Sequence, residues 1–254
     1  MSKRVVVTGR GVMTPLGNDV STFWEALVAG KSGVGPITMY DASAQAVRIA
    51  AEVKNFDPID VLGRKRVRRT NRFSQLALLA AEQAVADAGL NLRRNGDNRF
   101  TGVILGTGIG GIETLLNNLD IMAERGPKRV SALMIPMMMP NAGAGEIAIE
   151  YGLHGPALSL ASACATGSNA IGEAAERIRH GMAEVMICGG AESVMHPITL
   201  AALSNMRAVS HRNDEPEKAS RPFDANRDGF VMGEGAGVLV IESLEHAQKR
   251  GAHI

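Results

Sequence analysis

Two cysteines occur in the 254-residue chain, and only Cys164 lies where thiol chemistry is expected. It falls in the run Ala157-Leu-Ser-Leu-Ala-Ser-Ala-Cys-Ala-Thr-Gly-Ser, where an apolar strand gives way to an amphipathic helix. The thiolate is the reactive form of cysteine, and a helix N-terminus favours that anion and can stabilise an oxyanion. We expect Gly167 to relax the turn and Ser168 to cap the helix. A buried structural cysteine is the competing interpretation, and the spacing alone favours neither.

The second cysteine, Cys188, lies in an apolar core strand and is interpreted as structural. A cysteine nucleophile usually needs a base, but no histidine of the chain sits in a recognisable pairing motif. Solvated or capping roles are therefore expected for the histidines, and His196 is the hardest to dismiss. The six are His154, His180, His196, His211, His246 and His253. No metal site is expected, because the sequence has neither an HExxH motif nor paired-cysteine spacing.

A glycine-rich segment, Gly106-Thr-Gly-Ile-Gly-Gly111, follows a predicted strand and precedes a predicted helix. Its form is that of a dinucleotide-binding turn. Such sites carry an acidic ribose-binding residue about 20 positions further on, and Val130–Ala132 offer none. We therefore expect no bound cofactor, and interpret the segment as a turn that brings its backbone close to another group.

The segment Asp224-Ala-Asn-Arg-Asp-Gly229 begins like a calcium-binding loop. Position 12 of such a loop should be a bidentate glutamate, whereas here it is Gly235, with Glu234 one residue early. A turn stabilised by Asp and Asn side chains is the better interpretation.

Six cations occur within nine residues, and a smaller basic pair, Lys128 and Arg129, follows later. The six are Arg64, Lys65, Arg66, Arg68, Arg69 and Arg72. In a chain of net charge +1 this local excess could steer an acidic partner. The alternative is a solvated helix start, although cations oppose the dipole there. Nucleic acid is not expected, because no aromatic residues are interleaved for base stacking.

Short β-branched runs alternate with longer periodic segments, which favours an α/β layered fold with a largely parallel sheet. Most of the predicted strands are continuously apolar, as expected for strands buried on both faces. They are Arg4–Thr8, Gly102–Gly106, Ala157–Ala163, Val185–Gly189 and Gly237–Glu242. The predicted helices cover 21–28, capped by Ser21 and ended by Gly30, then 71–88, 112–119 and 171–178. The polar stretch His211–Arg221 is expected to be an exposed loop.

Composition sets the outer limits of function. The chain is 45% hydrophobic and 21% charged, which is ordinary for a globular domain. No apolar run reaches the roughly 18 residues of a membrane span. The apolar run within the first eleven residues is too short for the apolar region of a signal peptide. Two cysteines make no disulfide framework, so a reducing, cytoplasmic location is expected. Four methionines around Pro136 and Pro140 could line a flexible apolar pocket or simply pack in a core.

Taken together, these segments resemble the β-ketoacyl-acyl carrier protein synthase family, and most closely its bacterial type II elongating members. The matching stretches are VVVTGRGVMTPLG near the start, GTGIGG, ASACATGSNAIGEA, CGGAE and RPFDANRDGFVMGEGAG, in order along essentially the whole chain. The resemblance implies a thiolase-like fold, layered α/β/α/β/α in the full family, of which this chain would be the first half of an internal duplication with a mixed, largely parallel sheet.

The resemblance also implies roles for individual residues. Cys164 becomes the nucleophile that takes an acyl group from acyl carrier protein, after which malonyl-carrier protein loses carbon dioxide and condenses with it. Ile109 matches a pocket residue, and Leu203 and Arg207 match positions near the pocket and its entrance. The cations matching the carrier-docking patch are Lys65, Arg68, Arg69, Lys128 and Arg129. No cofactor is implied, and a homodimer is, with the methionine-rich stretch near its interface.

One departure from the family pattern bears on activity. The resemblance covers residues 1–254 as an N-terminal thiolase-like domain, whereas the family's two catalytic histidines, its lysine and a glycine-rich gating loop belong to the other half. We therefore expect the isolated chain to fail at decarboxylation and condensation. A non-catalytic half-synthase that binds acyl carrier protein or a synthase subunit is the alternative. A nucleotide-dependent oxidoreductase, based on the glycine-rich turn, ranks last.

Overall fold

The computed structural model describes residues 3–92 and 98–254. Its central sheet has five strands in the order β1-β7-β6-β4-β5. They are β1 (Val5–Met13), β4 (Thr101–Gly106), β5 (Ala157–Leu160), β6 (Val185–Glu192) and β7 (Gly235–Ser243). Strands β6, β4 and β5 run parallel, whereas β1 and β7 pair antiparallel with their neighbours. The predicted mixed sheet is thus confirmed, but only half of its pairings are parallel.

All five predicted strands differ from the structure at one end or both, and the largest differences are in the first and the third. The first continues to Met13, beyond the predicted end at Thr8. The third stops at Leu160 instead of Ala163 and is the outermost strand of the sheet, with Ala157 and Leu158 exposed. It is therefore not among the strands buried on both faces, and β4 is its only hydrogen-bonded partner strand among the described residues.

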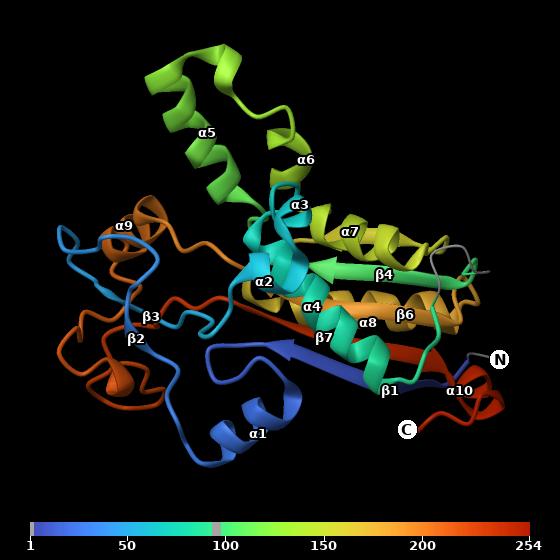
Figure 1. Cartoon of the computed structure of the whole chain (residues 1–254). Helices are drawn as coiled ribbons and strands as arrows, with labels where there is room; N and C mark the ends of the chain where they lie inside the picture. Colours follow the sequence, from blue (N-terminus) through green and yellow to red (C-terminus); the bar gives the residue numbers. More distant parts are fainter. Residues whose placement is uncertain (1–2, 93–97) are drawn as a thin grey trace.

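Helices cover both faces of the sheet (Figure 1). On one face lie α4 (Arg72–Asp87) and α7 (Ala142–Tyr151), and on the other lies α8 (Thr166–Arg179). Successive strand residues point to opposite faces, so Val103 and Leu105 pack with α4 while Ile104 packs with α8. Each such fully buried side chain contributes on the order of 1.5–3 kcal/mol to folding.

Capping explains where two of the helices begin. Helix α4 follows Asn71, whose side chain accepts the N–H of Phe73 at 3.3 Å, so the helix starts one residue after the predicted start at Asn71. Helix α1 (Val20–Val28) instead follows Asp19, whose carboxylate accepts the N–H of Thr22 at 2.8 Å. The predicted cap, Ser21, lies inside the helix, because the better acceptor two residues earlier takes this role.

A smaller lobe packs beside the carboxyl ends of the parallel strands. It contains β2 (Gly35–Pro36), β3 (Ile49–Ala50), α9 (Pro197–Asn205) and the 3-10 turn η3 (Pro216–Lys218) around its own core. The segment 211–221 holds only that turn, so the predicted loop is confirmed. Three short helices complete the body: α2 (Pro58–Leu62), α3 (Arg64–Val67) and α10 (Leu244–Lys249).

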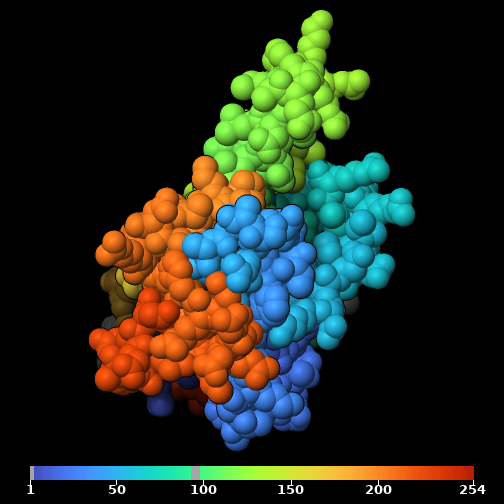
Figure 2. All heavy atoms as spheres, turned by 90° about the vertical axis from the view of Figure 1, so that its left-hand side faces the viewer, coloured from blue at the N-terminus to red at the C-terminus, as the bar shows by residue number. Residues whose placement is uncertain are grey.

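One part of the chain projects away from the rest. This arm consists of α5 (Ile112–Arg125), the turn η1 (Pro127–Arg129) and α6 (Met134–Met138), coloured green in Figures 1 and 2. Among its apolar side chains, Leu119, Met122 and Ile135 are exposed. The methionine-rich stretch therefore lies in the arm and is not part of the sheet's core. Within the described residues, no helix has the length and apolar character needed to cross a bilayer.

Candidate active site

Cys164 is exposed and lies in the turn η2 (Ala163–Ala165), directly between β5 and α8. The chain reverses direction here through Ala163, which has φ +52°. A left-handed conformation costs a residue with a Cβ about 1–2 kcal/mol, so the turn presents Cys164 at the expense of local strain. The expectation that Gly167 relaxes this turn is wrong, because Gly167 lies within the first turn of α8.

Thr166 holds the cysteine turn together, whereas Ser168, the predicted helix cap, lies inside α8 and does not cap it. Its hydroxyl oxygen accepts the N–H of Ser162 at 2.8 Å, and the hydroxyl donates to the carbonyl of Ala163 at 2.5 Å. Ala165 occupies the N-cap position, and no side chain caps α8. The first turn therefore keeps backbone N–H groups that favour an anion beside the cysteine.

Glycines allow the start of α8 to sit directly on the sheet. A Cβ on Gly106 would lie 2.4 Å from Thr166 Cγ2, and one on Gly190 would lie 3.1 Å from Gly167 Cα. The first contact leaves no room for a side chain, so the end of β4 requires glycine, while the second is merely tighter than an ordinary van der Waals contact. This close backbone packing fixes the position of Cys164 relative to the carboxyl ends of β4 and β6.

The glycine-rich turn after β4 binds a carboxylate from its own chain. Glu192 Oε2 accepts the N–H of Gly108 at 2.6 Å, and Oε1 accepts the Thr107 hydroxyl at 3.0 Å. Thr107 Oγ1 in turn accepts the N–H of Gly110 at 3.1 Å. Burial raises the pKa of Glu192, while these hydrogen bonds oppose the rise. Because the turn's donors already face an internal anion, the structure disfavours the dinucleotide interpretation. Sequence reasoning singled out the turn but missed Glu192, since nothing local links it to residues 107–110.

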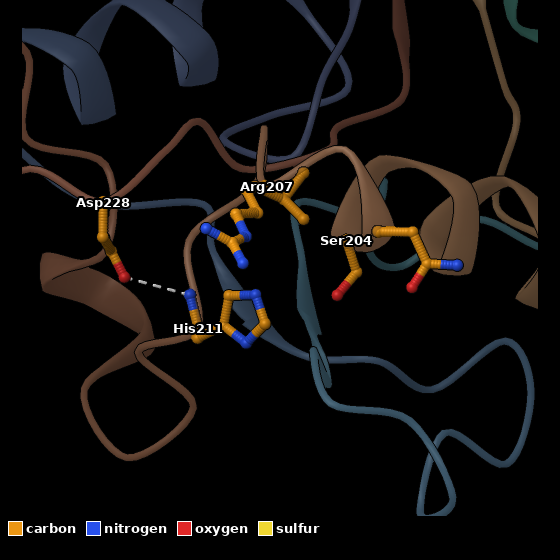
Figure 3. A pocket seen from close by; sticks show the side chains of 6 residues that line it. Ser204, Arg207, His211 and Asp228 are labelled. Atoms are coloured by element: carbon orange, nitrogen blue, oxygen red, sulfur yellow. Dashed lines mark hydrogen bonds between the residues drawn. The ribbon is translucent and has the colours of Figure 1, made fainter.

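The three predicted substrate-binding residues lie on two elements of the fold. Ile109 is 49% exposed on the glycine-rich turn, and Leu203 is half-buried in α9. Arg207 follows α9 in a left-handed conformation, with φ +56°. It lines a hollow of about 500 Å³ with Ser204, Asn205, Val209, His211 and Asp228, in which Asp228 accepts the backbone N–H of His211 at 3.1 Å (Figure 3). This hollow includes neither Ile109 nor Cys164, so the pocket roles of the three residues stay predictions.

Two of the six clustered cations are engaged in ion pairs. Arg66 pairs with Glu150, and Arg72 binds the buried carboxylate of Glu234 at 2.6 Å. The other four, which include Lys65, Arg68 and Arg69, are exposed on and just after α3. Lys128 and Arg129 are exposed in η1 at the tip of the arm, away from α3 in both views (Figures 1 and 2). Within one chain the two basic groups are therefore separate.

None of the histidines hydrogen bonds to Cys164 within the described part of the chain. His196 caps α9, where its Nδ1 accepts the N–H of Ile198 at 3.3 Å. His246 binds Glu242 Oε2 at 2.5 Å. Cys188 is fully buried under α8, which confirms that it is a core residue, and burial raises the pKa of its thiol to about 12.

The calcium-like segment is a side-chain-stabilised turn, as predicted. Asp224 Oδ1 accepts the N–H of Asn226 at 2.7 Å, and its carbonyl accepts the N–H of Arg227 at 3.3 Å. Residues 3–92 and 98–254 contain no group of three His, Cys, Asp or Glu side chains arranged to hold a metal ion.

The fold places the chain among the thiolase-like ketosynthases. A crystal structure of a β-ketoacyl synthase from Burkholderia phymatum STM815 is similar with a TM-score of 0.88 and 38% sequence identity, over 99% of this chain and 62% of that one. A structure of a type II PKS acyl carrier protein in complex with its ketosynthase is also similar. The matched chain is 32% identical, with a TM-score of 0.86 over 100% of this chain and 61% of that one.

Residues 2–247 match the family model described as "Beta-ketoacyl synthase, N-terminal domain", and the chain belongs to that family. Among curated relatives, the 3-oxoacyl-[acyl-carrier-protein] synthase 2 of Synechocystis sp. is 49% identical over 253 residues, which cover 99% of this chain and 60% of the relative. The protein of the same name from Coxiella burnetii is also 49% identical and is covered to 61%. The chain thus spans about three-fifths of the length of these relatives.

Proposed function

We propose that this chain carries the nucleophile of a β-ketoacyl-acyl carrier protein synthase that elongates fatty acyl chains by two carbons. In the first step the Cys164 thiolate attacks the carbonyl of an acyl thioester on acyl carrier protein, and the carrier's thiol leaves. In the second step malonyl-carrier protein loses carbon dioxide, and the resulting carbanion attacks the Cys164 thioester. A carbon–carbon bond forms, and the cysteine leaves as thiolate.

The observation that carries this proposal is the placement of Cys164. It is exposed at a strained turn, directly before a helix whose first N–H groups have no capping side chain. The start of this helix supplies backbone N–H donors for the oxyanion that forms at each carbonyl. An acyl chain bound near the Ile109 turn would gain about 0.8 kcal/mol for each methylene it buries.

Acyl carrier protein is the proposed partner. Exposed Lys65, Arg68 and Arg69 are cations for which no ion pair is found among the described residues, and they would attract an acidic protein. Lys128 and Arg129 form a second docking group on the arm. The carrier–ketosynthase complex among the similar structures supports this kind of partner. A cytoplasmic location, expected from two free cysteines, goes with the proposal.

A homodimer is also proposed. The outermost strand, β5, leaves one edge of the sheet open, and Leu158 on it is 41% exposed. Open, apolar strand edges are covered in stable proteins, and a second copy of the chain would cover this one. The exposed methionines of the arm would add to the same interface.

We further propose that the histidines and the lysine that assist decarboxylation lie in the part of the relatives that residues 1–254 do not match. In this N-terminal thiolase-like domain, His196 caps a helix and His246 binds a carboxylate. The relatives extend well beyond the matched region. By itself the chain is expected to stop at the acyl-enzyme.

The nucleophile is tested by incubating the protein with acyl carrier protein that carries an acyl thioester, and then measuring the intact mass by mass spectrometry. The wild-type protein should gain one acyl group, and Cys164→Ala should gain none. The matched control is Cys188→Ala, which removes the buried thiol and should still be acylated. Acylation of Cys164→Ala would overturn the proposal. Salt-sensitive carrier binding by a wild-type protein that never forms the thioester would favour the non-catalytic alternative.

A further inference from the structure

A buried polar cluster joins α4, α5 and the segment before β7. At its centre the side chain of Glu234 is fully buried and accepts two hydrogen bonds from Arg72, both at 2.6 Å. It also accepts the Ser193 hydroxyl and the N–H of Val53, each at 2.8 Å. Four hydrogen bonds therefore satisfy this carboxylate, and two of them come from the Arg72 guanidinium.

A second carboxyl group in the cluster, that of Glu113, lacks such partners. Glu113 lies in the first turn of α5, and its Oε1 is buried without a hydrogen-bond partner among the described residues. Arg72 from α4 and Glu234 from the segment before β7 lie close enough to Glu113 to act on its charge. Glu52, from the segment after β3, acts on Arg72 as a third acid. One cation therefore serves several acids, and two of its donors are already committed to Glu234.

These surroundings favour the neutral form of Glu113. Burial raises the pKa of Glu113 to about 7, and repulsion from Glu234 adds to the rise. Attraction to Arg72 and an interaction with the backbone N–H of Met195 oppose it. A neutral carboxyl group with a buried, unpartnered oxygen is tolerated far better than a carboxylate in the same place.

We propose that Glu113 is a positioning residue that must carry a proton to seat the first turn of α5 against the Arg72–Glu234 ion pair. The seat is well defined, because Asn71 Nδ2 donates to Thr114 Oγ1 at 2.8 Å between the two helices. The turn that holds Ile109 leads directly into it, and Gly111 N–H donates to the carbonyl of Met138 in α6 at 3.1 Å. Loss of the proton would loosen both the glycine-rich turn and the base of the arm.

The direction of the pH dependence follows from the raised pKa. In an opened state Glu113 meets water and titrates near its ordinary value, so the seated state binds the proton more tightly. Seating is therefore strongest below the ordinary pKa of a glutamate and weakens as pH rises through about 7. This inference concerns the fold of the arm and holds whether or not Cys164 is the nucleophile.

Hydrogen–deuterium exchange of peptides within residues 107–125 tests the proposal. After correction for the intrinsic exchange rate, the opening constant of the wild-type protein should rise about tenfold between about pH 6 and pH 8. Glu113→Gln keeps a neutral side chain of the same shape, so its opening constant should not change over this range. Glu124→Gln, which removes an exposed carboxylate from the same helix, should behave like the wild type.

The same rise in Glu113→Gln as in the wild type would overturn the proposal, and so would a wild-type opening constant that does not depend on pH. Infrared spectroscopy provides a test that needs no folded Glu113 variant. The wild-type protein should show a protonated carboxyl band at about pH 6 that disappears by about pH 8, and its absence at pH 6 would overturn the proposal. Glu192→Gln should retain the band, since Glu192 is another buried carboxyl whose pKa is raised.

Discussion

Glu192 Oε2 accepts the backbone N–H of Gly108 at 2.6 Å, which joins the end of β6 to the turn that follows β4. The two strands are parallel neighbours, so their carboxyl ends meet at one edge of the sheet. A single carboxylate therefore organises a turn whose sequence alone suggests an external phosphate.

Removing this carboxylate should weaken the turn specifically. Glu192→Ala leaves the donors of Thr107 and Gly108 without their acceptor, so we expect the free energy of unfolding to fall by about 1–3 kcal/mol in urea titrations. Glu173→Ala removes an exposed carboxylate from α8 and should change the free energy of unfolding by less than about 0.5 kcal/mol. Equal effects of the two substitutions, or binding of a nicotinamide dinucleotide by the wild type, would contradict this account.

Two glycines test the close packing of α8 on the sheet. Gly106→Ala would place a Cβ 2.4 Å from Thr166 Cγ2, so we expect a loss of about 1–3 kcal/mol and slower acylation of Cys164. Gly172→Ala, in the middle of α8, meets no atom within 4 Å and should stabilise the protein by about 0.5–1 kcal/mol. The comparison fails if both substitutions shift the thermal midpoint in the same direction.

Acid should weaken the contact between the first and last strands of the sheet. Burial pushes the pKa of Glu242 upward, but hydrogen bonds from Arg250, Thr8 and His246 outweigh it and hold the pKa below its ordinary value. A lowered pKa stabilises the fold above the ordinary pKa of a glutamate, and this part is lost as pH falls through the folded pKa.

Glu242→Gln should therefore be less stable than the wild type at neutral pH, by about 2–4 kcal/mol, because Arg250 loses its buried partner. The difference should shrink as pH falls below about 5, where the wild type loses the same interaction. Urea titrations at a series of pH values measure it, with the exposed Glu176→Gln as the control. A difference that stays constant down to acid pH would rule this explanation out.

The basic residues near α3 should control carrier binding. Reversing Lys65, Arg68 and Arg69 to glutamate should raise the Kd for acyl carrier protein at least about tenfold at low salt, and less at high salt, where charges are screened. Reversing the exposed Lys31, Lys54 and Lys249 changes the net charge equally and should leave the Kd nearly unchanged. Equal weakening by both triple variants would mean that only net charge matters.

The sequence predicts the elements whose signals are local. Helix α4 has an apolar period, an Asn cap and a terminal glycine, while β4 and β6 are buried apolar runs. The length of β1 depends on tertiary packing instead. Gly9 and Gly11 look like the end of a strand, but a Cβ at either would lie about 2 Å from a carbonyl of α4, so these glycines let the helix pack directly on the strand.

The residues of the candidate site also divide into those with a local sequence signal and those without one. Cys164 could be found from the strand, the small residues and the helix that follow one another along the chain. The left-handed Ala163 could not, because alanine carries no signal for that conformation. The buried polar cluster of Glu113, Glu234 and Arg72 was not predicted either, since its residues come from three separate segments that meet only in the folded state.

The pairing of β1 with β7 has a consequence for how the protein folds. Val5 lies opposite Ser243, and Thr8 donates to Glu242 across 234 positions of sequence. During synthesis the first strand therefore has no sheet partner until almost the whole domain has left the ribosome. Such a long closure slows folding and leaves the apolar start of the chain unpaired in the meantime. The early segment should thus be a binding site for chaperones in the nascent protein, and its docking should be among the last events of folding.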